Sequence, residues 1–331
     1  MKEMSNLKYP SETQLKYTQS VLPFPPDVII QLLIEADDET FNKLCSSNEF
    51  KSFCSSKSIL SERIYDERAR KLVEKRFSKD LIEFKPKEMK WREFYDRTRE
   101  FIKNIDRVYS DILADEGKLL ELKMLYEIKG VLPNQVGVDL AGQNGHLDVL
   151  KWIYSINGLF PDPETSINYI AEQGYLDILK WLYETFNLLP DQTGIYWAAG
   201  NGQLDVLEWI HSLNGSLPDQ SGSNRAAAYN KISLLEWIYE KTGIVPDQYG
   251  VNQAAQHGSL ETLKWIYEKT RILPDQTGIV YATYNGRLEV LKWIYEKIGS
   301  SGLPDQNTID LAKGYGQLDV AEWVNSKRSN R

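Results

Sequence analysis

The spacing of apolar and polar residues repeats along the C-terminal two thirds of the chain, with a tryptophan at the same position of each repeat. Successive tryptophans are separated by 29, 28, 28, 28, 28 and 30 residues, and a proline lies at each boundary between repeats. Self-similarity at one fixed period is typical of stacked repeat architectures. The sequence therefore predicts an array of about seven full units, marked by Trp152, Trp181, Trp209, Trp237, Trp265, Trp293 and Trp323.

Within each unit the pattern predicts two short helices joined by a tight turn. In the unit that begins at Pro190, small residues centred on Ala198 favour a first helix that packs closely against its neighbours. Gly202 follows and supplies a left-handed turn that other residues adopt only at a cost. Apolar residues from Leu204 to Ile210 recur at helical spacing and predict the second helix. Because one unit cannot bury both helices, neighbouring units must stack.

The repeated tryptophans are expected to pack between units. An aromatic side chain at one fixed phase of a helix indicates structural packing rather than a ligand cage. Met124 occupies the same position one repeat earlier, which indicates a leading partial unit. The tyrosines two positions after most of the tryptophans are expected on the outer face.

The repeats resemble ankyrin repeats. Residues 145–150, with the sequence GHLDVL, look like the Gly-His-Leu-Glu stretch that opens the second ankyrin helix, and residues 198–202, AAGNG, match the family's Ala-Ala-x-x-Gly. The likeness covers about residues 115–325. The ankyrin period is about 33 residues, so about five residues are missing, and the Thr-Pro-Leu-His box is absent. The resemblance therefore implies an all-α, ankyrin-like helix-turn-helix solenoid with short or absent β-fingers.

Positions that vary between units are candidates for binding a target. The residue type differs between units at the positions eight, nine and twelve residues before each framework tryptophan. These positions share one face of the first helix. The ankyrin resemblance implies that this face is a concave groove, and rigid aromatic residues are favoured anchors in such sites. Trp197 is the leading candidate, although some of these residues could simply pad the helix pair. The predicted groove residues are Tyr169, Trp197, Arg225, Tyr229, Gln253, His257, Tyr281 and Tyr284.

The N-terminal segment 20–56 resembles an F-box. A Leu-Pro pair and a following Pro-Asp match the opening of that motif, and residues 44–50, LCSSNEF, match its Leu-x-x-Val-Ser-Lys-x-Trp stretch. An additional Phe24-Pro25 and Asn48 depart from the pattern. The resemblance implies contacts to the linker subunit of a cullin-type (cullin–RING) ubiquitin ligase, made by apolar anchors in a groove. These anchors would be Leu22, Pro23, Val28, Ile29, Leu32, Leu44 and Phe50.

The remaining segments complete the expected domain order. Residues 1–19 are expected to be a flexible N-terminus, and residues 57–113 are expected to be a helical bridge and cap with two amphipathic helices divided at Lys85-Pro86. The array covers 114–326, and 327–331 form a polar tail. The alternative to the F-box is that residues 20–56 serve only as a helical cap of the array.

Charge and composition narrow the classes of partner. The chain carries a net charge of −8, and the segment from Ala114 to Arg331 has 18 basic and 27 acidic residues, a net of −9. This excess repels phosphate backbones and argues against nucleic-acid binding. No long apolar run or signal core suggests a membrane or secretion. The two cysteines, Cys45 and Cys54, are expected to be small buried residues in a reducing compartment.

We therefore expect a non-catalytic adaptor that links a ubiquitin ligase to a protein target in the groove. No nucleophile–base pair, phosphate loop or metal-ligand spacing stands out, so no enzyme activity, cofactor or metal is expected. The alternatives are an ankyrin-repeat scaffold without a ligase link and a structural component of a virion or of the cytoskeleton. We expect a monomer in the cytoplasm. The repeats also look like those of large DNA viruses, and this likeness implies the host cytoplasm if the chain is viral. A nuclear location is the alternative.

Overall fold

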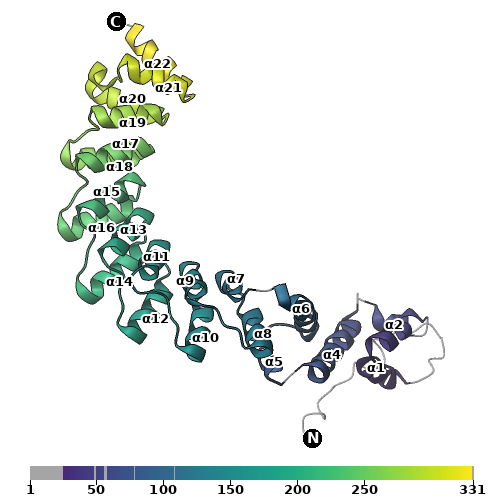
Figure 1. Cartoon of the computed structure of the whole chain (residues 1–331). Helices are drawn as coiled ribbons and strands as arrows, with labels where there is room; N and C mark the ends of the chain where they lie inside the picture. The colour runs from purple at the N-terminus through teal and green to yellow at the C-terminus, as the bar shows by residue number, and fades with distance from the viewer. Residues whose placement is uncertain (1–24, 48–49, 56–57, 78, 108, 330–331) are drawn as a thin grey trace. The chain divides into compact units, whose positions relative to one another are not determined.

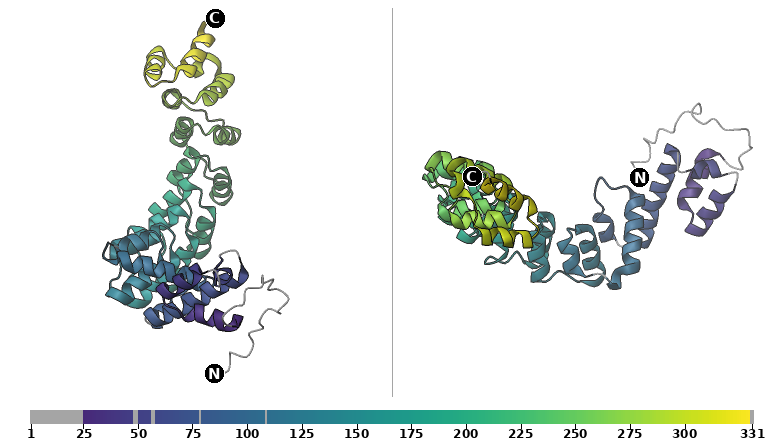
Figure 2. Two further views of the ribbon diagram at one scale, coloured as in Figure 1. Left: turned by 90° about the vertical axis from the view of Figure 1, so that its right-hand side faces the viewer. Right: turned by 90° about the horizontal axis from the view of Figure 1, so that it is seen from above.

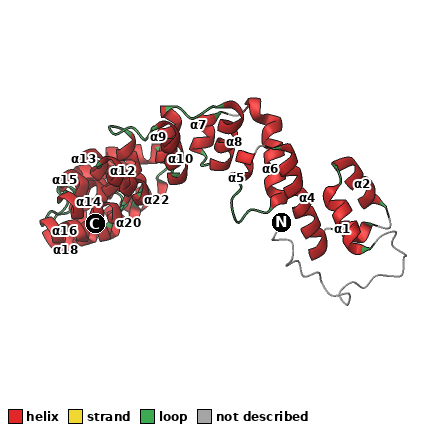
Figure 3. Cartoon of the chain, turned by 90° about the horizontal axis from the view of Figure 1, so that it is seen from below, coloured by secondary structure: helices red, strands yellow, loops and turns green. Residues whose placement is uncertain are grey.

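The computed structural model describes residues 25–47, 50–55, 58–77, 79–107 and 109–329, which fall into two compact units. The first unit comprises residues up to Val108 together with Leu120–Val131, and the second comprises Tyr109–Leu119 and Leu132–Arg331. The described residues form helices, turns and loops without any strand (Figure 3), which confirms the predicted all-α solenoid. The expected flexible segment 1–19 and the candidates Leu22 and Pro23 lie outside the described residues.

The second unit is an array of paired helices (Figure 1). Successive pairs follow one another along it in Figure 1 and in the left-hand view of Figure 2. A short leading helix, α7 (Ser110–Asp115), packs against the first helix of the first full pair. The first helices are α9 (Gln135–Gln143), α11 (Ser166–Gln173), α13 (Gln192–Asn201), α15 (Gln220–Ala228), α17 (Gln248–His257), α19 (Gln276–Tyr284) and α21 (Gln306–Gly314). The second helices are α10 (Leu147–Asn157), α12 (Leu176–Phe186), α14 (Leu204–Asn214), α16 (Ile232–Thr242), α18 (Leu260–Thr270), α20 (Leu288–Ile298) and α22 (Leu318–Ser329).

Local chemistry sets the ends of each first helix. The carboxylate of Asp191 accepts the backbone N–H of Thr193 at 2.7 Å and of Gly194 at 3.2 Å, and so caps α13. At the other end, Gly202 adopts a φ of 78°, and the N–H of Gln203 bonds the carbonyl of Ala198 at 2.9 Å. This left-handed turn reverses the chain into α14, as the sequence predicts.

Small residues let the first helices approach one another closely. Ala198, Ala227 and Ala255 are fully buried, and each first helix contacts the first helix of the next unit. The prediction that alanines mark the contact between units is confirmed. The core is therefore a row of interfaces rather than one globular centre.

The framework tryptophans pack across the interfaces between second helices. Tyr183 lies edge-on to Trp209 with ring centres 5.9 Å apart, and Tyr239 lies edge-on to Trp265 at 6.2 Å. His211 takes the place of tyrosine against Trp237. Edge-to-face aromatic pairs are stabilising, so the repeated tyrosines act as packing partners for the next unit's tryptophan.

The first unit contains α1 (Pro26–Glu35), α2 (Asp38–Ser46), α3 (Lys51–Cys54), α4 (Ile59–Arg76), α5 (Lys79–Glu83), α6 (Trp91–Asn104), a 3-10 turn (Ile105–Arg107) and most of α8 (Leu119–Lys129). The first of the two helices expected in the bridge stops at Arg76, and Leu81 lies on the separate α5. An apolar cluster holds α1 to α4 together, and its buried members are Ile29, Leu33, Phe41, Phe50, Phe53 and Ile64.

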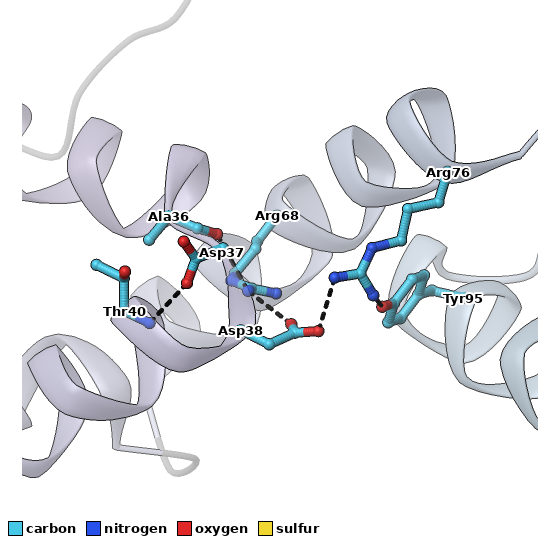
Figure 4. Close-up of polar contacts among 7 residues, drawn as sticks. All are labelled: Ala36, Asp37, Asp38, Thr40, Arg68, Arg76 and Tyr95. Carbon is cyan, nitrogen blue, oxygen red and sulfur yellow. Dashed lines mark hydrogen bonds and ion pairs between the residues drawn. The ribbon is translucent and has the colours of Figure 1, made fainter.

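A charged network joins α2 to α4 (Figure 4). Asp38, at the start of α2, accepts from Arg68 at 2.8 Å and from Arg76 at 3.0 Å, both on α4. Arg68 is almost fully buried, also donates to the carbonyl of Ala36 at 3.1 Å, and lies over the ring of Phe41. Burial alone would raise the pKa of Asp38, but the hydrogen bonds from the two arginines outweigh it and lower that pKa.

The two cysteines form a disulfide, contrary to the expectation of free thiols. Cys45 at the end of α2 is bonded to Cys54 at the end of α3, and their Cα atoms are 5.5 Å apart. Packing of Phe41 and Phe53 in one core brings α2 and α3 to this distance, which suits a disulfide. Spacing along the sequence alone could not reveal this approach, because it depends on the tertiary packing of the two helices.

Replacing Trp237 with alanine should lower the free energy of unfolding by about 3 kcal/mol, because the side chain is buried between units. The measurement is urea unfolding of the full chain followed by circular dichroism. Tyr249→Ala is the control, since Tyr249 is mostly exposed and should change stability by less than about 0.5 kcal/mol. Equal losses in the two variants would contradict the assigned packing role.

Replacing Asp38 with asparagine should destabilise the first unit by about 1 kcal/mol at neutral pH, since it removes a partly exposed partner of two arginines. Because the folded pKa of Asp38 is lowered, this contribution is complete above the unfolded pKa of about 4 and is lost as the pH falls through the folded value. Hydrogen exchange of the α2 and α4 amides at neutral and acidic pH measures the difference. Glu39→Gln, at an exposed ion pair, should change exchange little at either pH.

Candidate functional site

A cleft of about 510 Å³ lies across the first helices of three successive units, α13, α15 and α17. Four of the predicted groove residues line it, and they lie on α15, directly after α15 or on α17: Arg225, Tyr229, Gln253 and His257. The remaining lining residues are Gln192, Thr193, Tyr196, Asp219, Ser221, Asn224, Ala228 and Tyr249.

The other four predicted groove residues lie outside this cleft. Tyr169 and Trp197 pack against each other, with ring centres 4.9 Å apart and planes tilted by 40°. Trp197 is half-buried, whereas Tyr169 is exposed. Tyr281 is exposed on α19, and Tyr284 lies 6.1 Å from the ring of Tyr315. Trp197 with Tyr169 and Tyr284 with Tyr315 therefore form local aromatic pairs outside the cleft.

Arg225 is the central cation of the cleft. Its Nη1 donates to the hydroxyl of Tyr196 at 3.3 Å, and its guanidinium carbon lies 4.7 Å from the Tyr196 ring centre and 5.5 Å from that of Tyr229. The Nε atom is buried and has no hydrogen-bond partner among the described residues. Gly200 provides the space, since a Cβ atom there would lie 2.4 Å from this nitrogen.

His257 closes the far side of the cleft. Its ring centre lies 5.0 Å from that of Tyr229, at a tilt of 44°. Partial burial and, secondarily, the positive charge of Arg287 lower the pKa of His257 below its usual 6.5. The imidazole is therefore neutral at pH 7 and can both donate and accept a hydrogen bond.

Sequence reasoning missed Tyr196 and Tyr249, although one internal comparison points to Tyr196. Thirteen positions before the framework tryptophan or Met124, most units carry Asp or Asn. Their side-chain oxygens accept the backbone N–H at the start of the next unit, for example Asn224 from Asp247 at 3.0 Å. Tyr196 replaces this framework residue in its unit. The other acceptors of this polar ladder are Asp111, Asp139, Asn168 and Asn252.

The predicted F-box contacts divide between core and surface. Val28 and Leu32 lie one helical turn apart on the exposed side of α1, with exposed fractions of 41% and 37%. Ile29 and Phe50 are buried in the apolar cluster, and Leu44 packs partly against it. Of the described candidates, Val28 and Leu32 are thus the side chains free to meet a partner.

No protein-family model matches the chain, and no curated protein matches it. Within the described ranges, no three or more histidine, cysteine, aspartate or glutamate side chains are grouped to hold a metal ion. None of the helices that the structure describes is long and apolar enough to cross a membrane.

Replacing Arg287 with glutamine should raise the pKa of His257 toward 6.5, since it removes the neighbouring positive charge while the burial remains. Titration of the His257 ring protons by NMR measures this value in the full chain. The exposed Lys264→Gln serves as the control and should leave the pKa unchanged. An unchanged pKa in Arg287→Gln would show that burial alone lowers it.

Proposed function

We propose that this chain is a non-catalytic adaptor with two binding surfaces. The N-terminal helices bind the linker subunit of a cullin-type ubiquitin ligase, as the F-box resemblance implies, and the ankyrin-like array holds a protein target on its first-helix face. The observation that carries the proposal is the clustering of aromatic and polar side chains in one cleft across three units.

The exposed apolar side of α1 supports the ligase arm. Ile29 and Leu33 fill the core from one side of α1, while Val28 and Leu32 extend the apolar surface to the adjacent, exposed side. A helix in a small unit that is apolar on two sides has surface available for a partner. Binding of such anchors in an apolar groove is a common mode of helix recognition.

The variable side chains of the array support the target arm. The framework alanines and tryptophans are occupied in contacts between units, whereas the cleft presents Tyr229, Tyr249 and His257 with substantial exposure. Tyrosine side chains combine a large contact area with a hydrogen-bonding hydroxyl and are enriched in energetically important interface positions.

The second candidate is an interaction scaffold with no ligase link. The bonds from Arg68 and Arg76 to Asp38 tie α2 firmly to α4, so α1 to α3 are an integral part of the first unit. If these helices have a purely structural role, the exposed Val28 and Leu32 do not contact a partner.

A pull-down with the purified linker subunit tests the ligase arm. Wild-type chain should be retained, and Val28→Asp/Leu32→Asp should lose at least about tenfold of the signal, because charges replace desolvated apolar anchors. Both side chains are exposed, so helicity should not change. Ile59→Asp, which alters an apolar residue with 91% exposure on α4, is the matched control. Recovery of the wild type at background level would reject the ligase arm in favour of the scaffold.

Affinity capture followed by mass spectrometry tests the target arm. The baits are the wild-type chain and Trp197→Ala. A captured protein that depends on Trp197, with helicity unchanged, supports the groove. A large loss of helicity would show instead that Trp197 is a structural residue, and unaltered capture would show that the target does not depend on Trp197.

A further inference from the structure

The unit that contains α13 departs from the polar ladder of the array. In the units that contain α15 and α17, Asn224 and Asn252 accept the N–H of the next unit and donate to its capping aspartate, at 3.0 Å and 2.9 Å. Tyr196 holds the equivalent position in α13 and cannot make these bonds. Val280 also replaces the framework residue, in α19, but Tyr196 differs from it because its ring lines the cleft.

With Tyr196 in place of the framework asparagine, a glutamine amide at the cleft also lacks its usual hydrogen-bond partner. Gln220 donates to Asn224 at 3.2 Å and to the carbonyl of Val245 at 2.9 Å, and Gln248 makes the matching pair of bonds. Gln192 has the same place in its unit, but within the described residues it makes neither bond. Its two amide N–H groups are therefore available to a ligand at the cleft wall.

Arg225 lies between these groups without a counter-ion. No carboxylate of the described chain lies within 4.0 Å of its guanidinium. Asp219 also lines the cleft, but its carboxylate caps α15 by accepting the N–H of Gly222 at 3.0 Å. Among the described residues, Tyr196 alone accepts a hydrogen bond from the five N–H donors of Arg225. An unpaired arginine held in place by two aromatic rings is unusual in a segment with a net charge of −9.

We propose that this cleft binds one carboxylate group of a partner protein segment, with Arg225 as the charged contact. The guanidinium donates two parallel N–H bonds to the carboxylate, the Gln192 amide donates a further bond, and Tyr229 and Tyr249 contact the flanking residues. The proposal rests on the target-binding role of the array and names the chemistry that the array recognises.

A single carboxylate fits the electrostatics better than a polyanion does. The net charge of −9 on the array segment repels a nucleic-acid backbone, whereas Arg225, the one arginine or lysine among the lining residues, can pair with one carboxylate. His257, neutral at pH 7, and Gln253 add hydrogen-bonding capacity without adding charge. The aromatic walls favour a segment that carries apolar residues beside its acidic residue.

The test is a selection of random heptapeptides displayed on phage against the full chain. Peptides selected by the wild type should be enriched in Asp or Glu beside apolar residues. Fluorescein-labelled copies of a selected peptide and of its Glu→Gln version are then compared by fluorescence anisotropy. The neutral version should bind about tenfold more weakly or worse, since it loses a charge-assisted pair. A copy ending in a free carboxylate, compared with its C-terminal amide, shows whether a chain terminus can supply the group.

Three variants locate the effect. Arg225→Met should abolish the preference for the acidic peptide. Tyr196→Asn should weaken binding of that peptide, because the restored asparagine accepts a hydrogen bond from Gln192, as Asn224 does from Gln220. Tyr196→Asn should also fold at least as stably as the wild type, which guards against misfolding as an explanation. Lys264→Met, which removes an exposed cation from α18, is the matched control and should leave binding unchanged.

Selected peptides without an acidic preference, or equal binding of the acidic peptide by wild type and Arg225→Met, would overturn the proposal. A target captured through Trp197 in that case would leave the general binding role of the array intact. If the wild-type chain shows no acidic preference in the peptide selection and also captures no target, the target arm as a whole is rejected.

Discussion

The contact between neighbouring units is the interaction on which the whole array depends. A pair of short helices exposes too much apolar surface to be stable by itself. Fully buried alanines let consecutive first helices come close together, and edge-on pairs such as Tyr267 with Trp293 join consecutive second helices. Each unit therefore shares its core with the next one. The positions that make these contacts are fixed in residue type, which explains both the high tryptophan content and the regular period of the chain.

This regularity also determines where specific chemistry can be placed. A framework asparagine or aspartate links each unit to the next through the backbone N–H at its start, and most units keep it. Tyr196 exchanges that link for a ring in the cleft, and Gly200 omits a side chain so that Arg225 can lie against that ring. One unit thus lacks this link, and its tyrosine lines the cleft instead. Neighbouring units, which keep the link, hold the altered one in place.

The first unit is stabilised by different means. Its apolar cluster is small, and a disulfide between Cys45 and Cys54 together with the Asp38–Arg68 pair supplements it. Such supplements are expected where few residues are available to form a core. The cluster itself takes up Ile29 and Leu33 of α1, so that one side of this helix is buried and the side with Val28 and Leu32 is exposed.

The sequence by itself determined the all-α repeat architecture, the phase of each helix pair and the structural role of the tryptophans, because these depend on local spacing that recurs in every unit. It also selected Arg225, Tyr229 and His257 as variable positions on one face. Only the tertiary structure decided that these three share a cleft with Tyr196 while Trp197 pairs with Tyr169 outside it, and that Cys45 meets Cys54. The physical reason is that periodicity specifies which side chains share a helix face. The distance between side chains of different helices depends instead on the size of every residue packed between them, as the missing side chain of Gly200 demonstrates.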